Sequence, residues 1–181
     1  VSRHLWWHVI VSFLLVVLAA GTVFAQANTR EAPSPSAKKL ASQRFREAKE
    51  AYQEGRYAAA ASLFEASDRL SPHANMRFNA ASAWEEAGET PRAATGFEAA
   101  LAMGTLDSES EKAARERLNA LKGSLAHVRI LQPLGAFVTV DHVQRTPVPT
   151  SFYLRPGSYE IVTEYRGTRT KTQASVVAGQ G

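Results

Sequence analysis

Residues 45–72 read FREAKEAYQEGRYAAAASLFEASDRLSP, and a weaker copy of this stretch begins 33 residues later. Seven of nine residue pairs at this offset are alike in character. The pairs are Phe45 and Phe78, Ala48 and Ala81, Tyr52 and Glu85, Gly55 and Gly88, Tyr57 and Thr90, Ala60 and Ala93, Phe64 and Phe97, Ser67 and Ala100, and Leu70 and Met103. A fixed offset of this length is typical of repeat architectures, in which each copy is one supersecondary unit.

Each copy has the pattern of two amphipathic helices. Ala41, Phe45, Ala48 and Tyr52 recur at helical spacing, and polar residues fill the other face. Gly55 can end this helix, because glycine tolerates the left-handed conformation of a C-terminal cap. The second, third and fourth helices are expected at about 56–70, 74–87 and 91–103.

Two residues of the fourth helix carry specific expectations. Thr90 is expected to cap its N-terminus, ahead of Pro91, which suits the first turn. Gly96 lies inside the helix, where glycine costs about 1 kcal/mol relative to alanine. We therefore expect Gly96 to permit close contact with a neighbouring helix.

A fifth helix is expected to close the stack. Asp107 or Ser108 can cap it, and its apolar residues Ala114, Leu118 and Leu121 lie on one stripe. A helix that is apolar on one side only suits the end of a stack, which needs a polar outer face.

These residues resemble the tetratricopeptide repeat family, over residues 38–123. The motif is A-x-x-x-Y-x-x-G-x-Y-x-x-A-x-x-x-F, and the second copy departs from it at Glu85 and Thr90. The matching residues are Ala48, Tyr52, Gly55, Tyr57, Ala60 and Phe64, followed by Pro72. The resemblance implies a right-handed stack of helix pairs whose concave surface binds peptides or partner proteins. The alternative is a short helical bundle with no groove, used as a spacer or dimer contact.

From Ala126 the apolar pattern changes to alternation. Strands are expected at 127–131, 136–141, 152–154, 158–165 and 168–177. Residues 146–149 are expected to break the chain, and Arg155-Pro156-Gly157 reads as a tight turn with glycine at its second inner corner. Short strands between glycine and proline turns predict a small antiparallel β-sandwich over residues 126–178. The expected fold class is thus α + β, with a helical stack followed by a β-sandwich.

This second half resembles the PEGA domain, a small β-module of bacterial envelope proteins. The matching pieces are residues 135–141, Thr146-Pro147, residues 154–161 and Arg166-Gly167. The pattern usually has glycine after the aspartate, whereas His142 follows Asp141 here. The resemblance implies an accessory domain outside the cytoplasm, often beside tetratricopeptide repeats and without established chemistry.

The N-terminal residues have the order of an export signal. Arg3 precedes an apolar core at residues 9–20, and Val23-Phe24-Ala25 places small residues one and three before a cut ahead of Gln26. The alternative is an uncleaved anchor formed by residues 5–24. Either reading predicts a periplasmic or otherwise extracytoplasmic protein. Residues 26–37 are expected to be a Pro/Ser tether, and Val1 in place of methionine suggests a non-standard start or a clipped fragment.

Composition and motifs exclude several kinds of chemistry. The chain of 181 residues has no cysteine, which excludes disulfides, thiolate metal sites and a cysteine nucleophile. No nucleophile-elbow, phosphate-loop or dinucleotide motif occurs in it. Asp141 and His142 could belong to a metal site or a dyad, but a polar turn is the better reading. The sequence predicts a protein that is not an enzyme and that has no catalytic residue, cofactor or metal.

Net charge separates the two halves. Residues 26–125 have 14 Lys and Arg and 14 Asp and Glu, whereas residues 126–181 have six and three. Arg145, Arg155 and Arg166 lie near turns, so they are candidates for a basic rim that meets an anionic cell-wall polymer or lipid headgroups. The alternative is an ordinary solvated surface. No run of Lys and Arg exceeds two residues, which argues against a nucleic-acid partner.

Two functions follow from these observations. The first is an exported adaptor of the bacterial envelope that holds a protein or peptide partner in the helical groove. The second is a glycan- or surface-binding module in which the β domain makes the contact and the helices act as a spacer.

Overall fold

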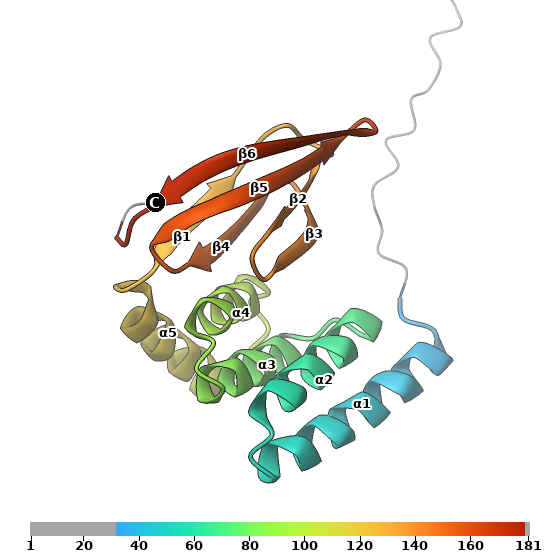
Figure 1. Ribbon diagram of the computed structural model, residues 1–181. Coiled ribbons are helices and arrows are strands. Elements are labelled where there is room, and N and C mark those ends of the chain that lie inside the picture. The colour runs from blue at the N-terminus through green and yellow to red at the C-terminus, as the bar shows by residue number, and fades with distance from the viewer. Residues whose placement is uncertain (1–31, 180–181) are drawn as a thin grey trace, which may run out of the picture. The chain divides into compact units, whose positions relative to one another are not determined.

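The structure is a computed structural model that describes residues 32–179. Within these residues five helices precede six antiparallel strands (Figure 1), which confirms the predicted α + β class. The predicted signal or anchor and residues 26–31 of the predicted tether lie outside the described residues. No helix between residues 32 and 179 combines the length and the apolar character needed to cross a membrane. The helices are α1 (Pro35–Gln53), α2 (Tyr57–Leu70), α3 (Ala74–Glu86), α4 (Thr90–Ala102) and α5 (Ser108–Lys122).

The first helix begins inside the predicted tether. Ser34 takes the N-cap position and its hydroxyl accepts a hydrogen bond from the Ala37 N–H, while Pro35 occupies the first turn. Serine followed by proline is a favourable helix start, because proline lacks the N–H that would otherwise be unpaired. The expectation of a tether up to residue 37 is therefore wrong for its last three residues.

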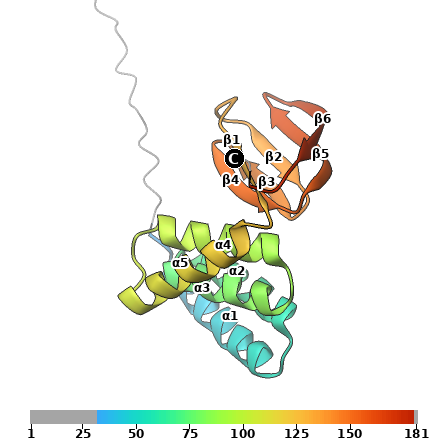
Figure 2. The same ribbon diagram turned by 90° about the vertical axis from the view of Figure 1, so that its left-hand side faces the viewer.

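The two helix pairs repeat in three dimensions (Figure 2). The ring centroids of Phe45 and Phe64 are 5.7 Å apart with planes inclined by 58°, and those of Phe78 and Phe97 are 5.8 Å apart with planes inclined by 56°. These pairs join α1 to α2 and α3 to α4 at equivalent positions. The offset seen in the sequence thus corresponds to a repeated packing geometry.

The turns within the helix pairs are also equivalent. Gly55 and Gly88 have φ values of 73° and 77°, which supports their predicted role as left-handed caps. Arg56 and Glu89 are the N-cap residues of the helices that follow, α2 and α4. Neither side chain makes a capping hydrogen bond. The prediction that Thr90 caps α4 is wrong, because this tight glycine turn places Glu89 at the cap and Thr90 in the first helical turn.

The cap and stripe predicted for the fifth helix agree with the structure. Asp107 is the N-cap residue of α5, and its carboxylate accepts a hydrogen bond of 2.8 Å from the Ser110 N–H. This bond and that from the Ser110 hydroxyl lower the pKa of Asp107. Ala114 is fully buried, and Leu118 and Leu121 pack against the same core.

The strands form two antiparallel sheets that enclose a second core. One sheet has the order β3-β2-β5-β6 and the other pairs β1 with β4. Val138 and Leu154, from different sheets, are both fully buried in this core. The strands are β1 (Ala126–Ile130), β2 (Phe137–Val140), β3 (Val143–Pro147), β4 (Thr150–Leu154), β5 (Gly157–Tyr165) and β6 (Thr168–Val176).

The strand prediction fails in three places. No strand is expected at residues 143–147, where the structure has β3 (Val143–Pro147). The expected break at 146–149 starts too early, since β3 extends to Pro147, which opposes Phe137. Proline is tolerated there because β3 is an edge strand and its outer side needs no ladder N–H. Gly157 opens β5 opposite Val176 rather than completing a turn, because β6 offers it a strand partner.

The left-handed residue of the turn between β2 and β3 is Asp141. Its φ is 48°, and the turn consists of Asp141 and His142 between the two strands. Aspartate is among the few residues that tolerate this conformation. The PEGA pattern has a glycine at the position of His142. Here Asp141, one residue earlier, takes the left-handed conformation of the turn instead.

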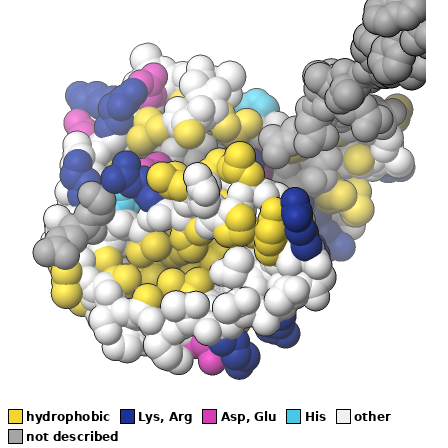
Figure 3. Space-filling model, turned by 90° about the horizontal axis from the view of Figure 1, so that it is seen from above, with side chains coloured by type: hydrophobic (Ala, Val, Ile, Leu, Met, Phe, Trp, Pro, Cys, Tyr) yellow, Lys and Arg dark blue, Asp and Glu magenta, His cyan; other side chains and the backbone are white. Residues whose placement is uncertain are grey.

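The core between the sheets is partly open on one face. Figure 3, seen from above Figure 1, shows hydrophobic side chains in a shallow hollow with Lys and Arg along its borders. Val128, Ile161 and Val176 are only partly buried against this core. The sheets therefore do not close into a complete barrel.

Candidate functional site

A groove crosses the first helices of the two pairs and the closing helix. It has a volume of about 410 Å³, and we call it the α1–α3–α5 groove. It is lined by Phe45, Lys49, Tyr52 and Gln53 of α1, Phe64 of α2, Phe78, Asn79 and Ser82 of α3, and Arg117 of α5.

The repeat places equivalent side chains in this groove. Phe45 and Phe78 are related by the 33-residue offset, as are Lys49 and Ser82, and all four line the groove. Residues four apart lie on one face of a helix, so each pair of positions presents one ring and one polar group. The groove therefore follows from the repeat itself.

The groove walls are aromatic. Tyr52 is half-buried and meets Tyr57 edge to face, with ring centroids 5.1 Å apart. Burial, with a smaller contribution from the Glu86 carboxylate, raises the pKa of Tyr52. Its hydroxyl therefore remains a neutral hydrogen-bond donor near pH 7.

Two polar groups of the groove are free to bind a ligand. Within residues 32–179, neither the Lys49 ammonium nor the Asn79 amide has a hydrogen-bond or ion-pair partner in range. An asparagine amide offers both donors and an acceptor, which matches the N–H and C=O of a peptide bond. A lysine ammonium supplies three donors and a positive charge for a carboxylate.

The second charged group of the groove, the Arg117 guanidinium, is held in place by the protein. One terminal nitrogen of Arg117 donates to the Ser82 hydroxyl at 2.9 Å and lies 3.2 Å from a carboxylate oxygen of Glu85. These contacts fix the guanidinium at one end of the groove and link α3 to α5. Arg117 thus shapes the groove, whereas Lys49 and Asn79 remain available.

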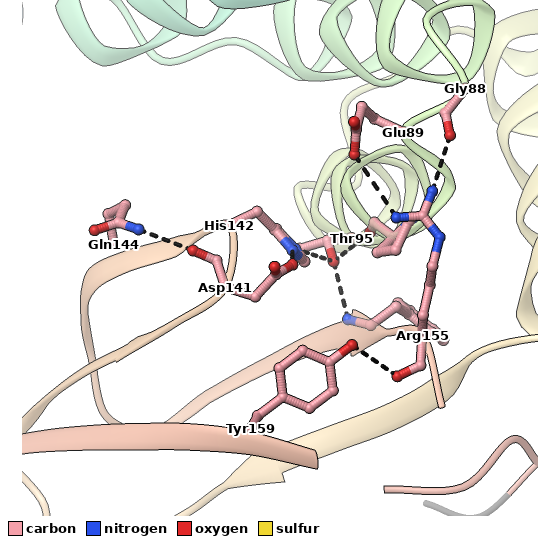
Figure 4. A network of polar contacts seen from close by, with 10 residues as sticks. Gly88, Glu89, Thr95, Asp141, His142, Gln144, Arg155 and Tyr159 are labelled. Atoms are coloured by element: carbon pink, nitrogen blue, oxygen red, sulfur yellow. Dashed lines mark hydrogen bonds and ion pairs between the residues drawn. The ribbon is translucent and has the colours of Figure 1, made fainter. Parts of the chain in front are cut away.

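A second polar cluster joins the helices to the sheets (Figure 4). The Thr95 hydroxyl of α4 donates to the Pro91 carbonyl at 2.8 Å and accepts from the Tyr153 N–H of β4 at 2.9 Å. Beside it, the Ser151 hydroxyl donates to the Glu98 carboxylate at 3.1 Å. Helix α4 and strand β4 are therefore bound directly to each other.

The order Asp141, His142, Thr95 resembles an acid–base–hydroxyl arrangement. His142 Nδ1 lies 2.8 Å from the Asp141 carboxylate, and its Nε2 lies 3.5 Å from the Thr95 hydroxyl. The hydroxyl proton is already donated to the Pro91 carbonyl, and the Tyr153 N–H uses its acceptor side. This geometry does not activate Thr95 as a nucleophile, which needs a close bond to its base. The cluster instead ties the β2–β3 turn to α4.

A hollow of about 420 Å³ lies beside this junction. Its polar residues are largely engaged with one another. The Trp84 indole N–H donates to Glu65 at 2.7 Å, Arg77 pairs with Asp68 at 3.0 Å, and the Arg92 guanidinium lies 4.4 Å from the Trp84 ring centroid. Satisfied groups gain little from a ligand, so the α1–α3–α5 groove is the better candidate for binding.

The three arginines of the predicted rim lie at two different places. Arg145 and Arg166 line one small pocket of the β domain, together with Arg169. Arg155 is elsewhere: it donates to the Gly88 carbonyl at 3.0 Å and lies 4.0 Å from the Glu89 carboxylate, at the junction with the helices. Arg155 and Arg166 flank opposite ends of β5, so they cannot share one rim.

No family model, curated protein or solved structure matches the chain. The groove must therefore be interpreted from its own chemistry. Sequence reasoning did not assign Lys49, Asn79 or Arg117 to a site. The signal that points to Lys49 is its offset partner Ser82, since both follow an aromatic residue by one helical turn.

Proposed function

We propose that this protein is an exported, non-enzymatic adaptor that binds an extended peptide segment of a partner protein in the α1–α3–α5 groove. The observation that carries the proposal is that Lys49 and Asn79, which have no hydrogen-bond or ion-pair partner within residues 32–179, lie beside the aromatic walls from Phe45 and Phe78. In this reading the helices are a tetratricopeptide-type stack and the strands a PEGA-type module of the bacterial envelope. The duplicated ring pairs and glycine turns support the first resemblance.

The groove chemistry defines the peptide that fits best. The aromatic walls favour an apolar side chain, because burial of apolar area is the main source of binding free energy. Asn79 favours a peptide bond that it can hold through a donor and an acceptor at once. Lys49 favours a carboxylate, from an acidic side chain or from a free C-terminus. The preferred ligand is therefore an extended segment that combines apolar and acidic residues.

Selection from a random peptide library tests this function. The chain is expected to enrich peptides with an apolar and an acidic residue, and Asn79→Ala and Lys49→Ala are each expected to weaken binding of a selected peptide about tenfold, or about 1.4 kcal/mol. Asn119→Ala on α5 and Lys39→Ala on α1 are matched controls, since both residues are exposed and lie outside the groove. Failure to enrich any peptide, or equal losses in the controls, would contradict the proposal.

A further inference from the structure

The β domain has a small pocket whose charge is strongly positive. Its volume is about 270 Å³, and it lies where the β5–β6 turn approaches the start of β2. Arg145, Arg166 and Arg169 line it together with one acid, Glu164. We call it the arginine pocket. Three guanidinium groups against one carboxylate leave a local charge of about +2, which favours an anion.

Strand pairing assembles this pocket. Phe137 of β2 opposes Glu164 of β5, which in turn opposes Arg169 of β6. Directly opposed residues of antiparallel strands point to the same face. The three side chains therefore form a row across the sheet, and Arg145 joins the row from β3.

Arg145 is fixed by two contacts. Its guanidinium carbon lies 4.1 Å from the Phe137 ring centroid, and its Nε lies 3.2 Å from a Glu164 carboxylate oxygen. The side chain is nevertheless 63% exposed. Because Glu164 takes the Nε edge, the terminal nitrogens remain available to an outside oxyanion, which arginine binds with two parallel hydrogen bonds.

Arg166 and Arg169 have no acidic partner within residues 32–179. The Arg166 guanidinium carbon lies 5.1 Å from the centroid of the Tyr165 ring, which packs against the core between the sheets. Arg145, Arg166 and Arg169 all line the pocket, so an oxyanion there would meet one guanidinium stacked on Phe137 together with an arginine from the β5–β6 turn and one from β6.

The backbone gives an independent reason to assign a role to these side chains. Arg145 and Arg166 have φ values of 41° and 49°, in the left-handed region that arginine rarely adopts. Arg166 and Gly167, with φ values of 49° and 78°, form the two-residue hairpin loop, where Asn-Gly is the preferred pair. Arginine is therefore not the residue that the turn itself favours. Unfavourable backbone states of this kind cluster at binding sites.

We propose that the arginine pocket binds phosphate or carboxylate groups of a polyanion, with one oxyanion held between Arg145, Arg166 and Arg169. This binding is independent of the peptide groove, which lies on the helices. The proposed pocket shares Arg145 and Arg166 with the basic rim predicted from the sequence. It contains Arg169 in addition, and it does not contain Arg155.

Calorimetric titrations of the full chain with three probes test the pocket. Inorganic tripolyphosphate represents phosphate chains, an oligogalacturonate represents carboxylate glycans, and chitotriose is the uncharged control. We expect one or both anions to bind, more weakly as salt rises because the arginines are exposed, and chitotriose not to bind. The two anionic arms distinguish a phosphate from a carboxylate ligand. Failure of both would overturn the proposal.

Arg166→Asn separates binding from folding. It places Asn-Gly in the hairpin, so the melting temperature is expected to stay equal or rise, while affinity for the bound anion falls at least fivefold. Arg129→Asn is the matched control, because Arg129 is an exposed arginine of β1 outside the pocket. An unchanged affinity in Arg166→Asn, or an equal loss in Arg129→Asn, would show non-specific charge attraction and overturn the assignment.

Discussion

Gly96 of α4 lies directly against Ala81 of α3. A Cβ atom added to Gly96 would lie 2.8 Å from the Ala81 Cβ, closer than real Cβ contacts allow. This confirms the expected close approach and explains a glycine inside a helix. The two helices of the second pair meet at this point, directly beside the fully buried Phe97.

Gly96→Ala is expected to destabilise the protein. Helix propensity alone would add about 1 kcal/mol, but the clash with Ala81 forces the helices apart, and overpacking typically costs about 1–3 kcal/mol. The free energy of unfolding in urea measures the outcome. Adding Ala81→Gly to this variant is the control, since it removes the clashing atom and should restore part of the loss. A Gly96→Ala variant more stable than the parent would contradict this packing.

Thr95→Val is expected to weaken the junction between α4 and β4. Valine keeps the shape but leaves the Tyr153 N–H without its acceptor. An unpaired donor in a part-buried site costs about 1–3 kcal/mol. Thr170→Val on exposed β6 is the matched control and should change the unfolding free energy by less than about 0.5 kcal/mol. Equal effects of the two substitutions would show that the Thr95 bond does not stabilise the fold.

Asp141 is expected to make the folded protein less stable in acid than near neutral pH. Burial opposes its ionisation, but the hydrogen bond and charge of His142 outweigh that effect and lower the pKa of Asp141. A lowered pKa in the folded state adds stability above the unfolded value of about 3.9, and this stability is lost as the pH falls through the folded value. Because the side chain is 48% exposed, solvent screening limits the contribution to less than about 1 kcal/mol.

Asp141→Asn isolates this charge, because asparagine also tolerates the left-handed φ of 48°. Thermal melts of the two proteins should differ most above pH 5, and the difference should shrink as the pH falls below the unfolded pKa of about 3.9. If the difference in melting temperature between the parent and Asp141→Asn does not change with pH, the charge of the Asp141 carboxylate does not contribute to stability.

The N-terminal prediction can be tested by fusion to reporter enzymes. Residues 1–31 placed before a phosphatase that is active only outside the cytoplasm should give activity, because the segment has the order of an export signal. Replacing Leu14 and Leu15 by Arg should abolish that activity, since charges interrupt the apolar core. Activity that survives this replacement would contradict export by this segment.

Local patterns predicted most of the helical part. Apolar spacing and glycine positions indicated five helices, and Asp107, one of the two residues expected as the cap of the fifth, is its N-cap. The errors at Pro147 and Gly157 fell where a neighbouring strand decides the outcome. Strand β3 reaches Pro147 because an edge position tolerates proline, and Gly157 is in β5 because β6 pairs with it.

The sites were less predictable, because they depend on contacts between distant residues. The rim predicted from charge contains Arg145 and Arg166, which line one pocket, and Arg155, which binds the Gly88 carbonyl in the helices. Nothing in local sequence places residues 67 positions apart in contact. The groove residue Asn79 was missed for the same reason, since a polar residue on a helix normally faces solvent.

The central claim is that the α1–α3–α5 groove holds a peptide. Titration of the isotopically labelled chain with a selected peptide, followed by NMR, tests it most directly. The account predicts that the largest shifts occur at the Asn79 side-chain amide and at the Lys49 and Phe78 resonances. In Asn79→Ala the shifts at Lys49 and Phe78 should need about tenfold more peptide, whereas in Asn119→Ala they should be unchanged. Shifts centred on Trp84 and His142, in the hollow beside the junction, or on the arginine pocket would contradict it.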